Sequence, residues 1–145
     1  AEDVSNADPQ ALVVATAASQ AVMQLGMPEA RIILAQAATY VACAPKSNSA
    51  IMAIDGAMEF VKAHPDYKIP SYLQDAHYKG AAKLGHGIGY KYAHDYKNHY
   101  ARQQYLPDAC KDIHFYNLSE QGYEKRLKEH LTRIHRESEE DNGGQ

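Results

Sequence analysis

Apolar residues recur with helical spacing along most of this chain of 145 residues. A polar start ends in Asp8-Pro9, which favours the beginning of a helix because aspartate accepts hydrogen bonds from free amides and proline fits the first turn. Residues 10–25 are then apolar on nearly every side and stop at Gly26, which predicts a first helix. A second alanine-rich helix is predicted over residues 28–43.

Two further helices are predicted to be amphipathic. Residues 49–63 place their larger apolar side chains on one stripe, formed by Ile51, Ile54, Met58 and Val61. Residues 120–136 carry a narrower apolar stripe after the capping residue Ser119. The i,i+4 spacing of Glu124 and Lys128 predicts an ion pair on the surface of this last helix.

A short helix over residues 75–84 and a long irregular segment complete the prediction. Across residues 85–117 neither a helical nor a strand period persists, apart from one turn near residues 103–106. Loops of this length inside a compact domain are more often functional or held down by their own side chains. The chain is therefore predicted to be all-α, with about five helices, as a helical domain over residues 1–137 followed by a disordered acidic tail over 138–145.

Charge is distributed unevenly around a net value of −3. Residues 77–105 contain five lysines and arginines against one aspartate, whereas residues 1–60 contain two against six acidic residues. Such opposed regions favour self-association or a basic face for an anionic partner, with ordinary scatter of surface charge as an equal alternative. The two cysteines form no paired motif, which indicates a reducing compartment. The longest apolar run, residues 32–44, is too short to cross a bilayer, and a chain that begins without methionine is expected to come from a longer protein.

The sequence shows no pattern of catalytic, cofactor-binding or metal-ligating residues. Residues 85–89 (GHGIG) do not match the dinucleotide fingerprint and follow no predicted strand, and no phosphate-binding loop is present. The loop histidines His86, His94 and His99 lack the spacing of a known metal motif. No serine or cysteine is paired with a base. We therefore expect no catalytic site, no cofactor and no metal site in this chain.

The loop does carry the composition of a nucleic-acid surface. Lys91, Lys97 and Arg102 are interleaved with five tyrosines, Tyr90, Tyr92, Tyr96, Tyr100 and Tyr105, of which Tyr90 and Tyr92 are the leading candidates for DNA contact. Aromatic rings beside a charged groove suit the stacking of single-stranded bases. The alternative is that the rings are buried to anchor the loop while their hydroxyls satisfy its backbone. For any single tyrosine the anchoring role is favoured, and the lysines are expected to be more exposed than the rings.

The two alanine-rich helices are the candidates for a subunit interface. Because alanine lets helix backbones approach closely, these helices either form the centre of the domain or are covered by another copy. The core role is favoured for each residue taken singly. The candidate interface residues are Leu12, Val13, Val14, Ile33 and Tyr40.

Several short sequence segments, taken together and in order, resemble one family. They are Glu2–Pro9, Leu34–Ala38, Ala44–Ala50, Gly89–Tyr96 and Gln103–Pro107. They are similar to the C-terminal region of the RarA/MgsA family of AAA+ ATPases, bacterial replication-associated recombination proteins related to the eukaryotic Werner-helicase-interacting ATPase. The resemblance extends from residue 2 to the end of the last predicted helix. One departure is Ala93, where the family pattern often has proline.

The resemblance implies a function as well as a fold. It implies an all-helical oligomerisation domain, comparable to the collar of clamp loaders, that forms a homotetramer of ATPases acting in replication, recombination and repair at stalled forks. ATP and magnesium would belong to upstream domains, not to this chain. The implied partners are further copies of the chain, single-stranded DNA and single-stranded-DNA-binding protein, in the cytoplasm and near the nucleoid, with no membrane. The alternative function is a module that binds single-stranded DNA through residues 77–105.

Overall fold

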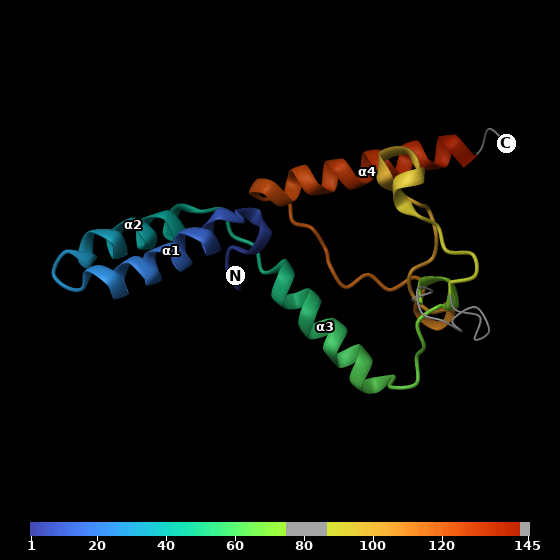
Figure 1. The fold of residues 1–145 in the computed structure, drawn as a ribbon, viewed down its shortest axis with the longest axis horizontal. Helices are drawn as coiled ribbons and strands as arrows, with labels where there is room; N and C mark the ends of the chain where they lie inside the picture. The colour runs from blue at the N-terminus through green and yellow to red at the C-terminus, as the bar shows by residue number, and fades with distance from the viewer. Residues whose placement is uncertain (75–86, 143–145) are drawn as a thin grey trace. The chain divides into compact units, whose positions relative to one another are not determined.

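The computed structural model describes residues 1–74 and 87–142. Within those residues every regular element is helical, which confirms the predicted all-α class, and no helix there is long and apolar enough to span a membrane. The α-helices are α1 (Gln10–Leu25), α2 (Ala30–Cys43), α3 (Ser49–Ala63) and α4 (Gly122–Asn142) (Figure 1). The short helix predicted over residues 75–84 lies outside the described residues.

The predicted end of α4 at Arg136 is wrong. The helix continues to Asn142, through most of the segment that was expected to be disordered. The added residues include three consecutive acidic residues, and glutamate is a good helix former. No glycine or proline occurs between Arg136 and Gly143, so the sequence offers no strong stop signal before that glycine.

The long loop contains single turns of 3-10 helix. In its described part these turns are η4 (Ala93–Asp95), η5 (Lys97–His99) and η6 (Asp108–Cys110). The turn predicted near residues 103–106 is wrong, because that segment is not helical.

The chain divides into two compact units. Unit 1 comprises residues 1–58 and 115–129, and unit 2 comprises residues 59–114 and 130–145. Both α3 and α4 begin in unit 1 and end in unit 2. Each unit therefore joins segments that are distant in the sequence, and each is described by itself below.

In unit 1, α1 and α2 lie side by side as an antiparallel pair (Figure 1). Gly26 ends α1 with a φ of +72° and a ψ of 177°, a backbone conformation that is nearly restricted to glycine. The buried core beside the pair is small and consists of Val4, Ala11 and Ala44, with Val41 packed against it. A core made largely of alanine and valine leaves many of the larger apolar side chains outside it.

The starts of α3 and α4 are joined through a buried carboxylate. Glu124, in the first turn of α4, is fully buried. Its Oε2 accepts hydrogen bonds from Ser47 Oγ at 2.9 Å and from the Ser119 backbone N–H at 2.9 Å. Its Oε1 accepts from Tyr116 OH at 3.0 Å and from the Ser49 hydroxyl. Four donors therefore satisfy this carboxylate.

The predicted surface pair of Glu124 with Lys128 is consequently wrong. Glu124 faces inward, and Lys128 forms an ion pair with Glu120. Burial alone would raise the pKa of Glu124, but the hydrogen bonds from Ser119, Ser49 and Ser47 outweigh burial and lower its pKa to about 2. The carboxylate is thus ionised at neutral pH.

Candidate functional site

The first candidate surface is the outer side of the α1–α2 pair. Leu12 and Val13 are more than half exposed. Further large apolar side chains of this helical pair and its turn are also exposed: Met23, Leu25, Met27, Ile32 and Leu34. Contiguous apolar surface on a folded unit commonly marks a contact with another protein. Leu12 and Val13 are therefore accessible to another protein, and their role in an interface stays a prediction.

The other candidate interface residues are placed differently. Val14 and Ile33 are half-buried and line a shallow groove of about 260 Å³ between α1 and α2, together with small side chains of both helices. Tyr40 is 37% exposed, and its hydroxyl donates a hydrogen bond to Asp8 Oδ2 at 2.9 Å. This hydrogen bond raises the pKa of Tyr40. Tyr40 thus ties the end of α2 to the beginning of α1.

Of the apolar stripe predicted on α3, Ile51 is half-buried and the other three residues are exposed. Ile54, Met58 and Val61 are all about half exposed or more. The opposite side of the helix is less exposed and includes Gly56, where an added Cβ would contact the Phe115 ring at 3.9 Å. Ile54, Met58 and Val61 therefore point outward, whereas two other large apolar residues of α3, Ile51 and Phe60, are half-buried.

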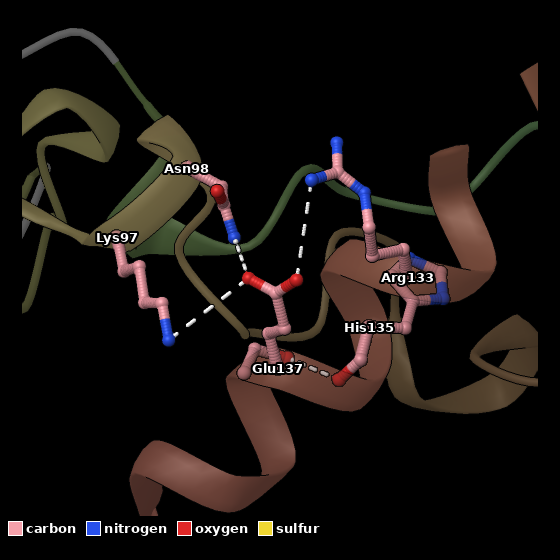
Figure 2. Close-up of polar contacts among 6 residues, drawn as sticks. Lys97, Asn98, Arg133, His135 and Glu137 are labelled. Carbon is pink, nitrogen blue, oxygen red and sulfur yellow. Dashed lines mark hydrogen bonds and ion pairs between the residues drawn. The ribbon is translucent and has the colours of Figure 1, made fainter.

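The second candidate surface lies in unit 2, on the loop that follows residue 86. Asn98 and His99 adopt left-handed backbone conformations with φ of +57° and +53°. Asparagine tolerates this conformation better than most residues. The kink directs the side chains of Lys97 and Asn98 toward the last part of α4, as Figure 2 shows.

Tyr90 and Tyr92, which are proposed to contact DNA, are among the exposed tyrosines of this loop, together with Tyr96 and Tyr105. Tyr90 is 58% exposed and Tyr92 is 53% exposed, so the favoured anchoring role is wrong for both rings. Two other tyrosines, the half-buried Tyr72 and the exposed Tyr105, donate hydrogen bonds to backbone oxygens. Tyr72 OH donates to the backbone oxygen of Gln104 at 2.5 Å, and Tyr105 OH donates to that of Ala101 at 3.1 Å.

The three predicted cations converge on one small hollow. It measures about 70 Å³. Its lining consists of Lys91, Tyr96, Lys97, Asn98, Tyr100, Arg102 and Ser138. The structure thus brings the predicted basic residues together, whereas the aromatic side chains among them are Tyr96 and Tyr100 rather than Tyr90 and Tyr92. We refer to Lys91, Lys97, Arg102 and this hollow as the basic surface.

Acidic side chains of α4 contact the same cations. Glu137 Oε2 lies 3.9 Å from Lys97 Nζ and accepts a hydrogen bond from Asn98 Nδ2 at 2.9 Å. Its Oε1 lies 4.0 Å from an Arg133 guanidinium nitrogen, so three donors surround the carboxylate (Figure 2). The Asn98 hydrogen bond is the main cause of a lowered pKa of Glu137, with smaller contributions from the nearby cations. Arg102 also pairs with Glu139 at 3.2 Å.

Sequence reasoning missed these acidic contacts. Glu137 is the last residue of the helical domain predicted over residues 1–137, and Glu139 falls in the predicted tail, so neither was considered as part of a site. The signal that could have found them is the opposite charge of two segments, the basic loop and the acidic run at residues 137–141.

The loop histidines form a ring contact rather than a recognisable metal site. The rings of His94 and His99 lie 4.8 Å apart between centroids, and Tyr92 lies 5.1 Å from His94. Across residues 1–74 and 87–142, no three histidine, cysteine or acidic side chains are grouped as metal ligands. His86 falls outside those ranges.

Comparison with known proteins places the chain in a family. The family model described as MgsA AAA+ ATPase C terminal matches residues 1–135. The chain belongs to this family. The family match covers the α1–α2 pair, the loop and most of α4. The sequence resemblance to the RarA/MgsA ATPases is thereby confirmed.

Individual relatives agree with the family match. Replication-associated recombination protein A of Bacillus subtilis is 46% identical over 129 residues, which are 88% of this chain and 31% of that protein. An uncharacterized AAA domain-containing protein of Mycobacterium tuberculosis is 44% identical over 133 residues, 92% of this chain and 29% of that protein. ATPase WRNIP1 of Dictyostelium discoideum is 36% identical over 116 residues, 79% of this chain and 13% of that protein. The matched region is thus less than a third of each of these relatives.

Proposed function

We propose that this C-terminal AAA+ domain holds several copies of a longer ATPase together. The observation that carries the proposal is the exposed apolar surface of α1, α2 and α3. Leu12 and Val13 on α1 and Ile54 and Met58 on α3 are 49% to 58% exposed, although side chains of these types usually lie in protein interiors. Covering such residues with another copy would remove their apolar area from water, which favours association.

The family membership supports the proposal that the assembly is a homotetramer of ATPases acting on DNA. The B. subtilis relative carries the name replication-associated recombination protein, which supports a role in replication, recombination and repair. A homotetramer would hold four copies of an upstream ATPase module in one ring, and those modules would bind ATP and magnesium. We place this assembly in the cytoplasm beside the nucleoid, where single-stranded-DNA-binding protein would be a further partner.

Molar mass in solution tests the oligomerisation. Light scattering coupled to size exclusion at about 20 µM should give a mass near four chains, because a stable interface at this concentration needs only micromolar affinity. Replacing Leu12 and Val13 together by aspartate should shift the protein to the monomer. The matched control replaces Ser19 and Gln20 by aspartate, since both are exposed polar positions of the same helix.

Circular dichroism should show the same helix content for all three proteins. A monomeric wild-type chain would contradict the proposal. Equal dissociation of the Leu12/Val13 variant and the Ser19/Gln20 control would show that added charge, and not the removal of apolar side chains, caused the effect. In that case the first surface would not be the interface.

A second candidate function is binding of single-stranded DNA at the basic surface. The observation that favours it is the convergence of Lys91, Lys97 and Arg102 on one hollow, next to a loop whose Tyr90 and Tyr92 are exposed. Cations supply contacts to phosphates, and exposed rings supply stacking for bases of any sequence.

Fluorescence anisotropy with a labelled thymidine 20-mer tests this second function. Replacing Lys91, Lys97 and Arg102 by alanine should weaken binding and make the dependence of log K on log salt shallower by about one for each phosphate that the variant no longer neutralises. The control replaces three other exposed lysines of unit 2 by alanine: Lys62, Lys68 and Lys111. If both triple variants weaken binding equally, the basic surface has no special role.

A further inference from the structure

The basic surface of unit 2 is already in contact with an anionic segment of the same chain. Residues 137–141 contain four acidic residues. Two of them, one on each side of Ser138 in the sequence, form ion pairs with the basic surface. Glu137 pairs with Lys97, and Glu139 pairs with Arg102. Two of the three cations that were predicted to contact DNA thus lie beside carboxylates.

One residue of the acidic segment lines the hollow of the basic surface. Ser138, which lies between the two glutamates, lines the hollow together with Lys91, Lys97 and Arg102. A phosphate that entered the hollow would lie within reach of the same cations that the glutamates contact. Carboxylate and phosphate are both anions that bind these side chains through charge-assisted hydrogen bonds. The two groups would therefore compete for the same partners.

The two carboxylates are held with different strength. Glu137 is 22% exposed and receives a hydrogen bond from Asn98 in addition to its cations (Figure 2). Glu139 is 60% exposed, and its partner Arg102 is 53% exposed. Exposed ion pairs of this kind contribute little to stability and are screened by salt. The Glu139 contact could thus open first, without unfolding of α4.

We propose that the acidic end of α4 is a built-in competitor of single-stranded nucleic acid at the basic surface. This inference rests on the second candidate function given above. Without nucleic acid, Glu137 and Glu139 neutralise Lys97 and Arg102. When a phosphate backbone binds, it displaces these carboxylates, so that only polyanions of high charge density compete successfully and weaker anions are rejected.

The test compares three proteins of 145 residues by anisotropy with a labelled thymidine 20-mer. They are the wild type, the E137Q/E139Q variant and the matched control E59Q/E129Q, which raises the net charge by the same amount at exposed positions. Glutamine keeps the length of glutamate, and its oxygen can still accept the hydrogen bond from Asn98. Circular dichroism of each protein verifies that α4 is folded.

The proposal predicts a specific gain for one variant. E137Q/E139Q should bind the oligonucleotide about threefold to tenfold more tightly than the wild type, as expected for the loss of two solvent-accessible ion pairs. E59Q/E129Q should bind less than about twofold to threefold more tightly, which is the square root of that factor. The salt dependence should also become steeper in E137Q/E139Q. In the wild type, salt weakens both the DNA contact and the competing intramolecular contact, so the two effects partly cancel.

Each other result overturns the proposal in a distinguishable way. Equal gains for both double variants would show an effect of net charge alone. If E137Q/E139Q binds the oligonucleotide no more tightly than the wild type, while the wild type still binds through Lys97 and Arg102, the proposed competition is wrong and the DNA-binding function still stands. If none of the three proteins binds the oligonucleotide, the DNA function itself fails and the competitor fails with it.

Discussion

Glu124 and Glu137 lie on the same helix, α4, but in different units and in different surroundings. Glu124 is fully buried, and its four donors are hydroxyl groups and one backbone N–H. Glu137 is 22% exposed, and its partners are Lys97, Arg133 and the amide of Asn98. The buried carboxylate is satisfied by neutral donors alone, whereas the partly exposed one combines a neutral donor, Asn98, with two cations at 3.9 and 4.0 Å.

The different surroundings indicate that the contacts of Glu124 stabilise the fold, whereas other anions can replace Glu137 at its partners. A buried carboxylate that lost a donor would keep its desolvation cost, because water cannot replace that donor. At an exposed carboxylate, water and salt ions replace a missing partner at little cost. We therefore expect the surroundings of Glu124 to tolerate no change and those of Glu137 to tolerate many.

The largest effect is expected at Gly122, which begins α4 beside this buried cluster. An added Cβ would lie 2.1 Å from the Ala7 carbonyl oxygen and 2.7 Å from Pro45 Cγ, and φ is +50°. Gly122→Ala should lower the free energy of unfolding by about 3 kcal/mol or more, or prevent folding. Urea denaturation followed by circular dichroism, at one fixed protein concentration, measures it.

Gly26 provides the control for this prediction. Its φ is also positive, at +72°, but no atom lies within 4 Å of an added Cβ. Gly26→Ala should therefore cost only the conformational strain of a backbone with φ +72° and ψ 177°, about 2 kcal/mol. Equal losses at the two glycines would mean that the close approach of Ala7 and Pro45 does not limit this site.

The next largest effect is expected for Glu124→Gln. Glutamine has one acceptor oxygen where the carboxylate has two, and its NH₂ group would face the hydroxyls of Ser49 and Tyr116 or the N–H of Ser119. Loss of the charge-assisted hydrogen bonds should reduce the free energy of unfolding by about 2 kcal/mol. Glu137→Gln is the matched comparison and should cost less than about 0.5 kcal/mol. If the two variants had the same free energy of unfolding, the burial of Glu124 would not make its contacts more important for stability than those of Glu137.

The free energy of unfolding should depend on pH through the ionisation of Glu124. The pKa of Glu124 falls from an ordinary 4.5 to about 2 in the folded chain. Because the folded pKa is the lower one, its contribution is complete above pH 4.5 and is lost as the pH falls from about 4.5 to 2. The loss should reach at most about 3 kcal/mol.

The difference between wild type and Glu124→Gln isolates this effect from other acidic groups. Urea denaturation of both proteins at pH 7, 5, 4 and 3 should show the difference in unfolding free energy shrinking as the pH falls. A difference that stayed constant over this range would show that Glu124 has an ordinary pKa in the folded chain.

The sequence predicted the helices well because their signals are local. Asp8 accepts a hydrogen bond from the Gln10 N–H at 3.0 Å, and Gly26 ends α1 as expected. The contacts of Glu124 with Ser47 and Ser49 span 77 and 75 residues, and no local period reveals such a pairing. A partial signal did exist, since Glu124 precedes the apolar Leu127 by three positions and therefore shares its side of the helix.

Burial in the loop was harder to predict than the helices. Without a regular period, nothing in the sequence distinguishes the exposed Tyr90 and Tyr92 from the half-buried Tyr72. The convergence of Lys97 and Arg102 with the end of α4 depends on the left-handed turn at Asn98 and on a helix that continues past Arg136. Local preferences permit both features, asparagine at the turn and good helix formers beyond Arg136, but the contact between Asn98 and Glu137 joins segments 39 residues apart.

The smallest effect is expected from a double-mutant cycle on Lys97 and Glu137. Lys97→Ala, Glu137→Gln and the double variant should give a coupling energy of about 0.5 kcal/mol or less, since the atoms are 3.9 Å apart and Lys97 is 57% exposed. The same cycle on Ser47 and Glu124, with Ser47→Ala, should give more than about 1 kcal/mol. Raising sodium chloride to about 0.5 M should reduce the first coupling and leave the second unchanged, because salt screens exposed charges and not buried hydrogen bonds. A salt-independent coupling at Lys97 would show that the acidic end of α4 is a fixed part of unit 2 and not an exchangeable contact.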